Sequence, residues 1–130
     1  MRFVIIRKAD EETEAGMMPS EELIAAMGAY NEEMVKAGVM RSGDGLKPSS
    51  RGARVKFNGG RPTVIDGPFT EAKELIAGFA LVQVGSKDEA VDLAERFLRV
   101  AGVGAAEVRE AFEPKQMNAP AGEERLAAAN

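Results

Sequence analysis

The stretch "VIDGPFTEAKELIAGFALVQV", residues Val64 to Val84, decides the fold, because its second half predicts a strand at the centre of a sheet. Residues 75–84 are apolar at almost every position. Side chains alternate between the two faces of a strand, so Phe79 and Leu81 share one face while Ala80 and Val82 share the other. A strand that is apolar on both faces is buried on both faces, which indicates a central position.

A second strand of this kind lies at the start of the chain, in "RFVIIR", residues 2–7. Helices are predicted beside both strands. Ser20 is a natural N-cap, and Gly38 ends the helix that follows it. Ser86 and Glu89 have the spacing of a capping box, and the helix that they begin ends near Gly102.

The remaining segments add a short strand within "VMRSGDG", residues 39–45, a hairpin in residues 53–65 turning at Asn58-Gly59, and a last strand in residues 105–112 that alternates Ala106, Val108 and Phe112 inward. The order predicts an α+β fold, a ferredoxin-like β-α-β-β-α-β sheet with an extra β-hairpin and helices on one face. Residues 1–113 form the expected domain. Residues 114–130 contain few large apolar side chains and are expected to form a flexible or appended tail.

The face of the sheet that the helices leave open is also apolar, since Val4 and Ile6 alternate with Phe3 and Ile5. Such a face has to be buried. In a chain this short, the simplest cover is the same face of a second copy, which gives an isologous homodimer. A monomer at micromolar concentration would contradict this expectation.

Composition limits the partners of the chain. A net charge of −4 over 130 residues argues against direct binding to nucleic acid or to an anionic membrane. No apolar run approaches the ~20 residues that span a bilayer, and the N-terminus does not have the pattern of a secretory signal. We therefore expect a cytoplasmic protein.

Two absences limit the chemistry. The chain has no cysteine, which excludes disulfides and thiolate nucleophiles, and no histidine, which removes the usual base at neutral pH. The common metal ligands are missing for the same reason, and we expect neither a metal nor a cofactor. Catalysis would have to use carboxylates, lysine, arginine, hydroxyls or Tyr30.

The segment "DGPF" has two interpretations. As a turn, Pro68 restricts the backbone, Asp66 forms an Asx-type hydrogen bond and Phe69 anchors the connection to the core. As a site, Asp66 faces a pocket that Asp44 and Lys47 reach from the glycine-rich loop. Two carboxylates, Asp66 and Asp44, and the Lys47 ammonium would then bind or deprotonate a small polar molecule, with Phe69 as a further ligand contact.

Other candidate ligand contacts also have simpler structural explanations. Tyr30 lies in an apolar helical stripe that is typical of a core. Arg54 could form an anion clamp with Arg51 and Arg61, although arginines on a hairpin are usually solvated. Glu71 and Lys73 would project from one side of an extended edge segment, as surface charges or as contacts to a ligand or to a second subunit.

Three motifs, "GDGL-PSS-GARV", "VIDGPF-EAKE" and "GF-LVQV", occur in this order, and with them residues 1–113 closely resemble the DGPF-domain branch of the YCII-related family. The resemblance implies a dimeric α/β-barrel of ferredoxin-like subunits, similar in architecture to muconolactone isomerase and to small cofactor-free monooxygenases. It also implies an association of some relatives with extracytoplasmic-function sigma factors. The family has no established biochemical activity.

The chain departs from that family at Lys47, where relatives commonly have a histidine. A lysine, with an ordinary pKa near ~10.4, stays charged at neutral pH, so histidine-based catalysis is excluded. We expect a small-molecule-binding homodimer with a regulatory role linked to sigma-factor systems. The alternatives are a cofactor-independent isomerase- or monooxygenase-like enzyme with a carboxylate base, and a protein-interaction module. That module would use the hairpin and the acidic loop "KADEETEAGMMPSEE" in residues 8–22.

Overall fold

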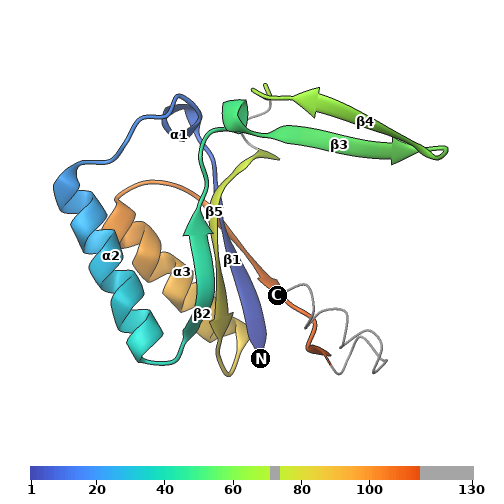
Figure 1. The fold of residues 1–130 in the computed structure, drawn as a ribbon. Coiled ribbons are helices and arrows are strands. Elements are labelled where there is room, and N and C mark those ends of the chain that lie inside the picture. Colours follow the sequence, from blue (N-terminus) through green and yellow to red (C-terminus); the bar gives the residue numbers. More distant parts are fainter. Residues whose placement is uncertain (71–73, 115–130) are drawn as a thin grey trace.

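The computed structural model describes residues 1–70 and 74–114 (Figure 1). Its elements, in chain order, are β1 (Arg2–Lys8), α1 (Glu11–Glu14), α2 (Glu21–Lys36), β2 (Met40–Gly45), a short 3-10 helix (Ser49–Arg51), β3 (Ala53–Asn58), β4 (Arg61–Asp66), β5 (Ile76–Gln83), α3 (Lys87–Ala101) and β6 (Ala106–Glu110).

Four of the strands form one antiparallel sheet in the order β2-β5-β1-β6. The two strands predicted to be central, β1 and β5, are its inner pair. Helices α2 and α3 lie together on one side of this sheet, and nothing covers its other side within the described residues (Figure 1). The predicted α+β, ferredoxin-like arrangement is confirmed.

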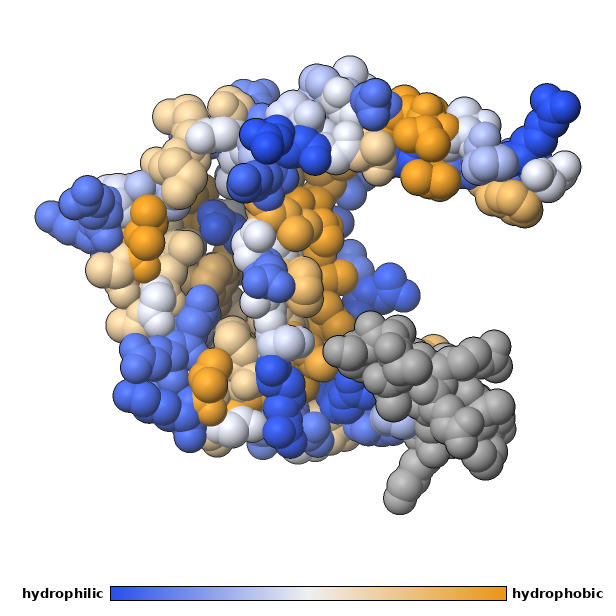
Figure 2. Space-filling model, viewed as in Figure 1, coloured by the Kyte–Doolittle hydropathy of each residue, from blue (hydrophilic) through white to orange (hydrophobic). Residues whose placement is uncertain are grey.

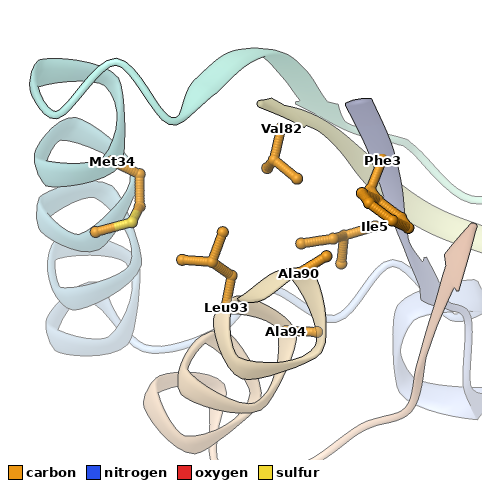
Figure 3. Close-up of a cluster of buried hydrophobic side chains, with 7 residues drawn as sticks. All are labelled: Phe3, Ile5, Met34, Val82, Ala90, Leu93 and Ala94. Atoms are coloured by element: carbon orange, nitrogen blue, oxygen red, sulfur yellow. The ribbon is translucent and has the colours of Figure 1, made fainter. Parts of the chain in front are cut away.

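The register of the central strands explains how the two faces differ. Phe3 pairs with Val82 and Ile5 pairs with Ala80, and these side chains face the helices. There they meet Met34 of α2 and three residues of α3, namely Ala90, Leu93 and Ala94 (Figure 3). The buried core of the described chain therefore lies between the sheet and its two helices.

Both long helices begin where the sequence predicts. The Ser20 hydroxyl accepts a hydrogen bond from the Leu23 amide, and the Ser86 hydroxyl accepts one from the Glu89 amide. The capping box predicted at Ser86 and Glu89 differs in one bond, because the Glu89 carboxylate accepts from the amide of Gly85 rather than from that of Ser86. The Leu23 and Glu89 amides that the two serines accept from are donors that a helix start leaves free.

Two predicted segments differ from the structure. The acidic loop before Ser20 contains the short helix α1, which a reciprocal pair of hydrogen bonds between Asp10 and Thr13 begins. The last strand ends at Glu110, and Phe112, predicted to point inward, is 72% exposed. The reason is that β6 pairs only with β1, and the paired residues of the two strands end at Phe3 and Glu110, so the side chain of Phe112 lies beyond the sheet.

The predicted hairpin is present as β3 and β4, which form a separate two-stranded sheet that projects away from the rest of the chain (Figure 1). The turn lies one residue later than predicted, because Asn58 pairs with Arg61 and the two central residues are Gly59 and Gly60. Their φ angles of 58° and 80° are left-handed conformations that glycine allows. None of the helices in the described residues is long and apolar enough to cross a membrane.

Candidate functional site

A cavity of about 310 Å³ lies between the helix-facing side of the sheet and the helices α2 and α3. Its wall is mostly apolar and carries a few polar side chains, as small-molecule sites do. The apolar side chains include Met27, Met34, Met40, Leu93 and Phe97, and the polar ones are Arg7, Tyr30 and Asn31.

Glycines make room for this cavity. One row of paired residues crosses the sheet as Gly45, Gly78, Arg7 and Ala106, and only Arg7 contributes a long side chain to it. A Cβ on Gly78 would lie 3.0 Å from the Asp44 carbonyl oxygen, whereas a Cβ on Gly45 would meet no atom within 4 Å. The space beside Gly45 is therefore open, and the "GDG" segment forms part of the cavity wall.

Tyr30 projects from α2 into the cavity wall. Its hydroxyl donates a hydrogen bond to the Leu93 carbonyl oxygen at 3.0 Å, and its ring centroid lies 6.2 Å from that of Phe97. Burial raises the pKa of the Tyr30 hydroxyl above its usual range. The hydroxyl is consequently neutral at physiological pH, with its oxygen still able to accept a hydrogen bond.

Arg7 and Asn31 line the cavity but are not among the residues that the motifs select. The Nε atom of Arg7 is buried, and its N–H donates no hydrogen bond to any of the described residues. The sequence does carry a signal for Arg7. It continues the alternation of Phe3 and Ile5, so it places a charge on the core-facing side of β1.

Asp44, a predicted catalytic residue, borders the cavity but contributes its main chain. It pairs with Phe79, and both lie between neighbours, such as Gly43 and Gly78, that also border the cavity. The pleat directs the side chains of Asp44 and Phe79 to the opposite face of the sheet from Ile5. The Asp44 carboxylate is accordingly exposed on the open face.

Lys47 and Asp66 are exposed and are not in the cavity wall. Asp66 ends β4, where it pairs with Ala53 at the base of the hairpin. The structure thus does not bring Asp44, Lys47 and Asp66 together around this cavity. Of the eight sequence-predicted site residues, only Tyr30 and Asp44 border it. Two others, Glu71 and Lys73, lie outside the described residues.

The "DGPF" turn is held by the 3-10 helix rather than by Asp66. The Phe69 amide donates to the Ser49 hydroxyl at 2.9 Å, and the Ser49 amide and hydroxyl both donate to the Glu14 carboxylate. Gly67 lies so close to this helix that an added Cβ would be 1.8 Å from the Ser49 carbonyl oxygen. The predicted Asx-type bond is missing, since the Asp66 carboxylate accepts no hydrogen bond from the described residues.

Phe69 does not join the buried core, as the turn interpretation predicts, but is half-buried at the base of the hairpin. The guanidinium of Arg54 lies 4.0 Å from its ring centroid, a cation–π geometry. This contact accounts for both residues without a ligand. Within residues 1–70 and 74–114, no cluster of three or more Asp or Glu side chains is arranged to hold a metal ion.

The antiparallel sheet, with two helices on one face and a cavity between them, defines a ferredoxin-like α+β protein. The chain belongs to the YCII-related domain family, whose model matches residues 1–115. It is 30% identical over 96 residues to an uncharacterized protein of Rhizobium meliloti (strain 1021), which covers 72% of this chain and 77% of that protein.

Among solved structures, the fold is similar to that of 5-chloro-2-hydroxyhydroquinone dehydrochlorinase from Burkholderia phenoliruptrix AC1100, in complex with 2,5-dihydroxybenzoquinone. The two structures superpose with a TM-score of 0.52 over 88% of this chain and 97% of the other, at 20% sequence identity. This likeness concerns the fold.

Proposed function

We propose that the protein binds a small molecule in the cavity between the sheet and the helices α2 and α3. The observation that carries the proposal is the row of glycines, because Gly45 and Gly78 keep about 310 Å³ free at a place where ordinary core residues would fill it. An empty apolar space inside a core lowers stability. A ligand that occupies this space offsets that loss.

A screen for ligand-induced thermal stabilisation, against small acids and lactones, tests the proposal. Gly45→Leu is the decisive variant, since its side chain extends into the open space beside Gly45. We expect this variant to fold and to lose the stabilisation by each ligand found. Gly28→Leu is the matched control, because Gly28 also has free space around it but is not in the cavity wall. Ligands that stabilise both variants equally would contradict the proposal.

A cofactor-independent enzyme is the second candidate. It is favoured by the similar fold of a dehydrochlorinase whose structure holds a ring compound small enough for such a cavity. It ranks second because the carboxylates of Asp44 and Asp66, the proposed bases, are exposed and do not point into the cavity. Turnover of a ligand from the screen, lost in Asp44→Asn or Asp66→Asn while binding persists, would put the enzyme first.

The proposed partner is a second copy of the chain, bound through the open face of the sheet. Val4 pairs with Leu81 and Ile6 pairs with Phe79, so four apolar side chains lie on this face. No helix packs on it in the described residues. An apolar sheet face left in water is unfavourable, and a symmetric dimer would bury it twice.

The hairpin supports the same proposal. Val55 pairs with Val64 and Phe57 with Pro62, so one side of the hairpin is apolar. Val55, Phe57 and Val64 are 68%, 71% and 63% exposed, and no other element of the described chain packs extensively against them. A lone two-stranded hairpin is only marginally stable in water. A partner that covers this side would stabilise it.

Figure 2 shows how the two surfaces relate. Apolar side chains gather along the four-stranded sheet and again on the projecting hairpin, with a hollow between hairpin and sheet. We expect the second copy to occupy this hollow, with the hairpin of each subunit lying against the other subunit.

Light scattering should give twice the chain mass of 13.9 kDa. Phe57→Ser should weaken the dimer at least ~10-fold, because truncating a buried aromatic at an interface removes ~2 kcal/mol or more. Lys56→Ser is its matched control, on the polar side of the same strand. A wild-type monomer at micromolar concentration would contradict the dimer and leave cavity binding unaffected.

A regulatory role, which the resemblance to relatives accompanying sigma factors implies, would follow if the ligand changes what the dimer contacts. A neighbouring sigma-factor gene would support this role. The third alternative is an interaction module that uses the hairpin and the acidic segment around α1. Such a module does not use the cavity, so its partner should still bind the Gly45→Leu variant.

A further inference from the structure

Arg7 pairs with Gly78, which in turn pairs with Gly45. Of these three residues, only Arg7 has a large side chain, and it lies on the cavity side of the sheet. Its other strand neighbour in that row, Ala106 of β6, is also small. The guanidinium therefore projects from a part of the sheet that has no other long side chain. Its carbon lies 5.8 Å from the ring centroid of Phe97, a cation–π contact that orients the group beside the cavity.

The charge of Arg7 lacks a direct partner within the described chain. Its Nε atom is buried and makes no hydrogen bond there, and none of the ion pairs that the described residues form includes Arg7. Asp10 is the acidic group that its charge influences, but the Asp10 carboxylate already accepts a hydrogen bond from the Thr13 amide. A guanidinium left half-buried without an anion is unfavourable, and an acidic ligand would remove that cost.

The other side chains of the cavity wall indicate what kind of molecule would carry the acidic group. Met27, Met34, Leu93 and Phe97 present apolar surface, and methionines adapt to ligands of differing outline. The volume of about 310 Å³ lies at the small end of ligand sites, which excludes long chains and large ring systems.

We infer that the cavity binds a compact organic monocarboxylate, with its carboxylate paired to the Arg7 guanidinium and its apolar body against the methionines and Phe97. This inference rests on the proposed function and names its ligand class. Guanidinium and carboxylate match in geometry, and a charge-assisted pair of this kind is stronger than a neutral hydrogen bond. Nothing in the motifs of the sequence points to Arg7 as a ligand contact.

The test compares acids with amides of the same shape. The full-length protein is titrated with a series of carboxylates, from propanoate to cyclohexanecarboxylate, and with the corresponding neutral amides. Tyr30 is the only tyrosine and the chain has no tryptophan, so tyrosine fluorescence reports from the cavity wall itself. These probes do not absorb where tyrosine does. We expect the best acid to bind ~10-fold or more tightly than its amide.

Arg7→Gln should lower the affinity for that acid ~10-fold or more and leave that for the amide almost unchanged. Arg7→Lys, which keeps the charge, guards against a folding defect of the first variant and should keep part of the acid preference. Arg99→Gln is the control, because Arg99 is exposed on α3 and its ion pair among the described residues is with Glu95. It should change neither affinity.

The outcomes separate the two proposals. Equal binding of acids and amides, or an equal loss of both in Arg7→Gln, would overturn the carboxylate site. If only the amides bind and Gly45→Leu blocks them, the proposed function stands without this site. If no acid and no amide binds, the carboxylate site is overturned, and ligands of other classes that Gly45→Leu excludes decide the fate of the proposed function.

Discussion

The hydroxyl of Tyr30 donates a hydrogen bond to the main-chain carbonyl oxygen of Leu93 at 3.0 Å, and this bond joins α2 to α3 directly beside the cavity. The two residues lie 63 positions apart in the chain. Their contact fixes the spacing of the two helices, and this spacing determines the width of the cavity. A substitution of Tyr30 therefore affects both stability and ligand binding.

Tyr30→Phe removes the hydroxyl and keeps the ring. We expect the free energy of unfolding to fall by about 1 kcal/mol, the usual net value of one hydrogen bond. Urea denaturation, followed by circular dichroism because the variant has no tyrosine signal, measures the change. An unchanged midpoint would show that the bond to Leu93 contributes nothing to stability.

The raised pKa of Tyr30 leads to a second prediction, which concerns the stability of the protein at alkaline pH. Burial, the largest cause, raises the pKa of the folded-state hydroxyl above the ordinary value of 10.0. The folded protein then holds its proton more tightly than the unfolded chain. Stability from this group is complete below the unfolded pKa and is lost as pH rises from there through the folded pKa.

Because the chain has one tyrosine, the absorbance of tyrosinate titrates this residue alone. We expect its midpoint to lie above that of the urea-unfolded protein, and a bound ligand in the cavity to raise it further if the ligand excludes water. In Tyr30→Phe, the alkaline loss of stability should be smaller. A midpoint equal to the unfolded value would contradict the burial of this hydroxyl.

The fold follows from local signals that the tertiary structure reinforces. The strands β1 and β5 are apolar on both faces, and Ser20 and Ser86 cap helices as their sequence context indicates. The hairpin forms as predicted, with its turn at Gly59-Gly60, one residue beyond the predicted Asn58-Gly59. Two local predictions are wrong. Phe112 lies beyond the paired residues of the edge strand, and the segment predicted as a loop contains α1, because a four-residue helix has almost no periodicity.

The site was harder to predict, because the motifs mark close backbone contacts as well as chemistry. Gly67 and Ser49 belong to the family signature, and in the structure they hold the "DGPF" turn to the 3-10 helix. Conversely, Arg7 lies in an ordinary strand and outside every motif. Its importance depends on the glycines that face it from β5 and β2, and strand pairing between distant segments is not visible in a local pattern.

The close approach of Gly67 to the 3-10 helix predicts a large effect of a small change. In Gly67→Ala the added Cβ would lie 1.8 Å from the Ser49 carbonyl oxygen, so main-chain atoms have to move apart. We expect a loss of ~3 kcal/mol or more, typical of severe overpacking. Thermal denaturation measures it.

Gly52→Ala is the matched control for that variant. Its Cβ would lie 3.7 Å from the same oxygen, an ordinary contact, and Gly52 has an allowed φ of −133°. The expected change is within ~0.5 kcal/mol of zero. Similar effects of the two substitutions would show that the turn is not held against Ser49 in solution.

Glu14 also stabilises the "DGPF" turn, through Ser49. Its carboxylate accepts hydrogen bonds from both the amide and the hydroxyl of Ser49, and that hydroxyl accepts from the Phe69 amide. The chain of bonds ties α1 to the "DGPF" turn and so sets the base from which the hairpin projects. An amide in place of the carboxylate has one acceptor oxygen and presents donors on its other side, so Glu14→Gln disrupts at least one bond.

We expect Glu14→Gln to lower the free energy of unfolding by ~1–3 kcal/mol, the range for a bond to a charged group. Hydrogen exchange of the Phe69 amide is the specific readout, since its acceptor is the hydroxyl that Glu14 orients. This amide should exchange faster in the variant, while amides in β1 change only with global stability. Glu11→Gln, an exposed position of the same helix, is the control. If both variants protect the Phe69 amide as the wild type does, Glu14 does not position the turn, and the hairpin angle is set by Gly67 alone.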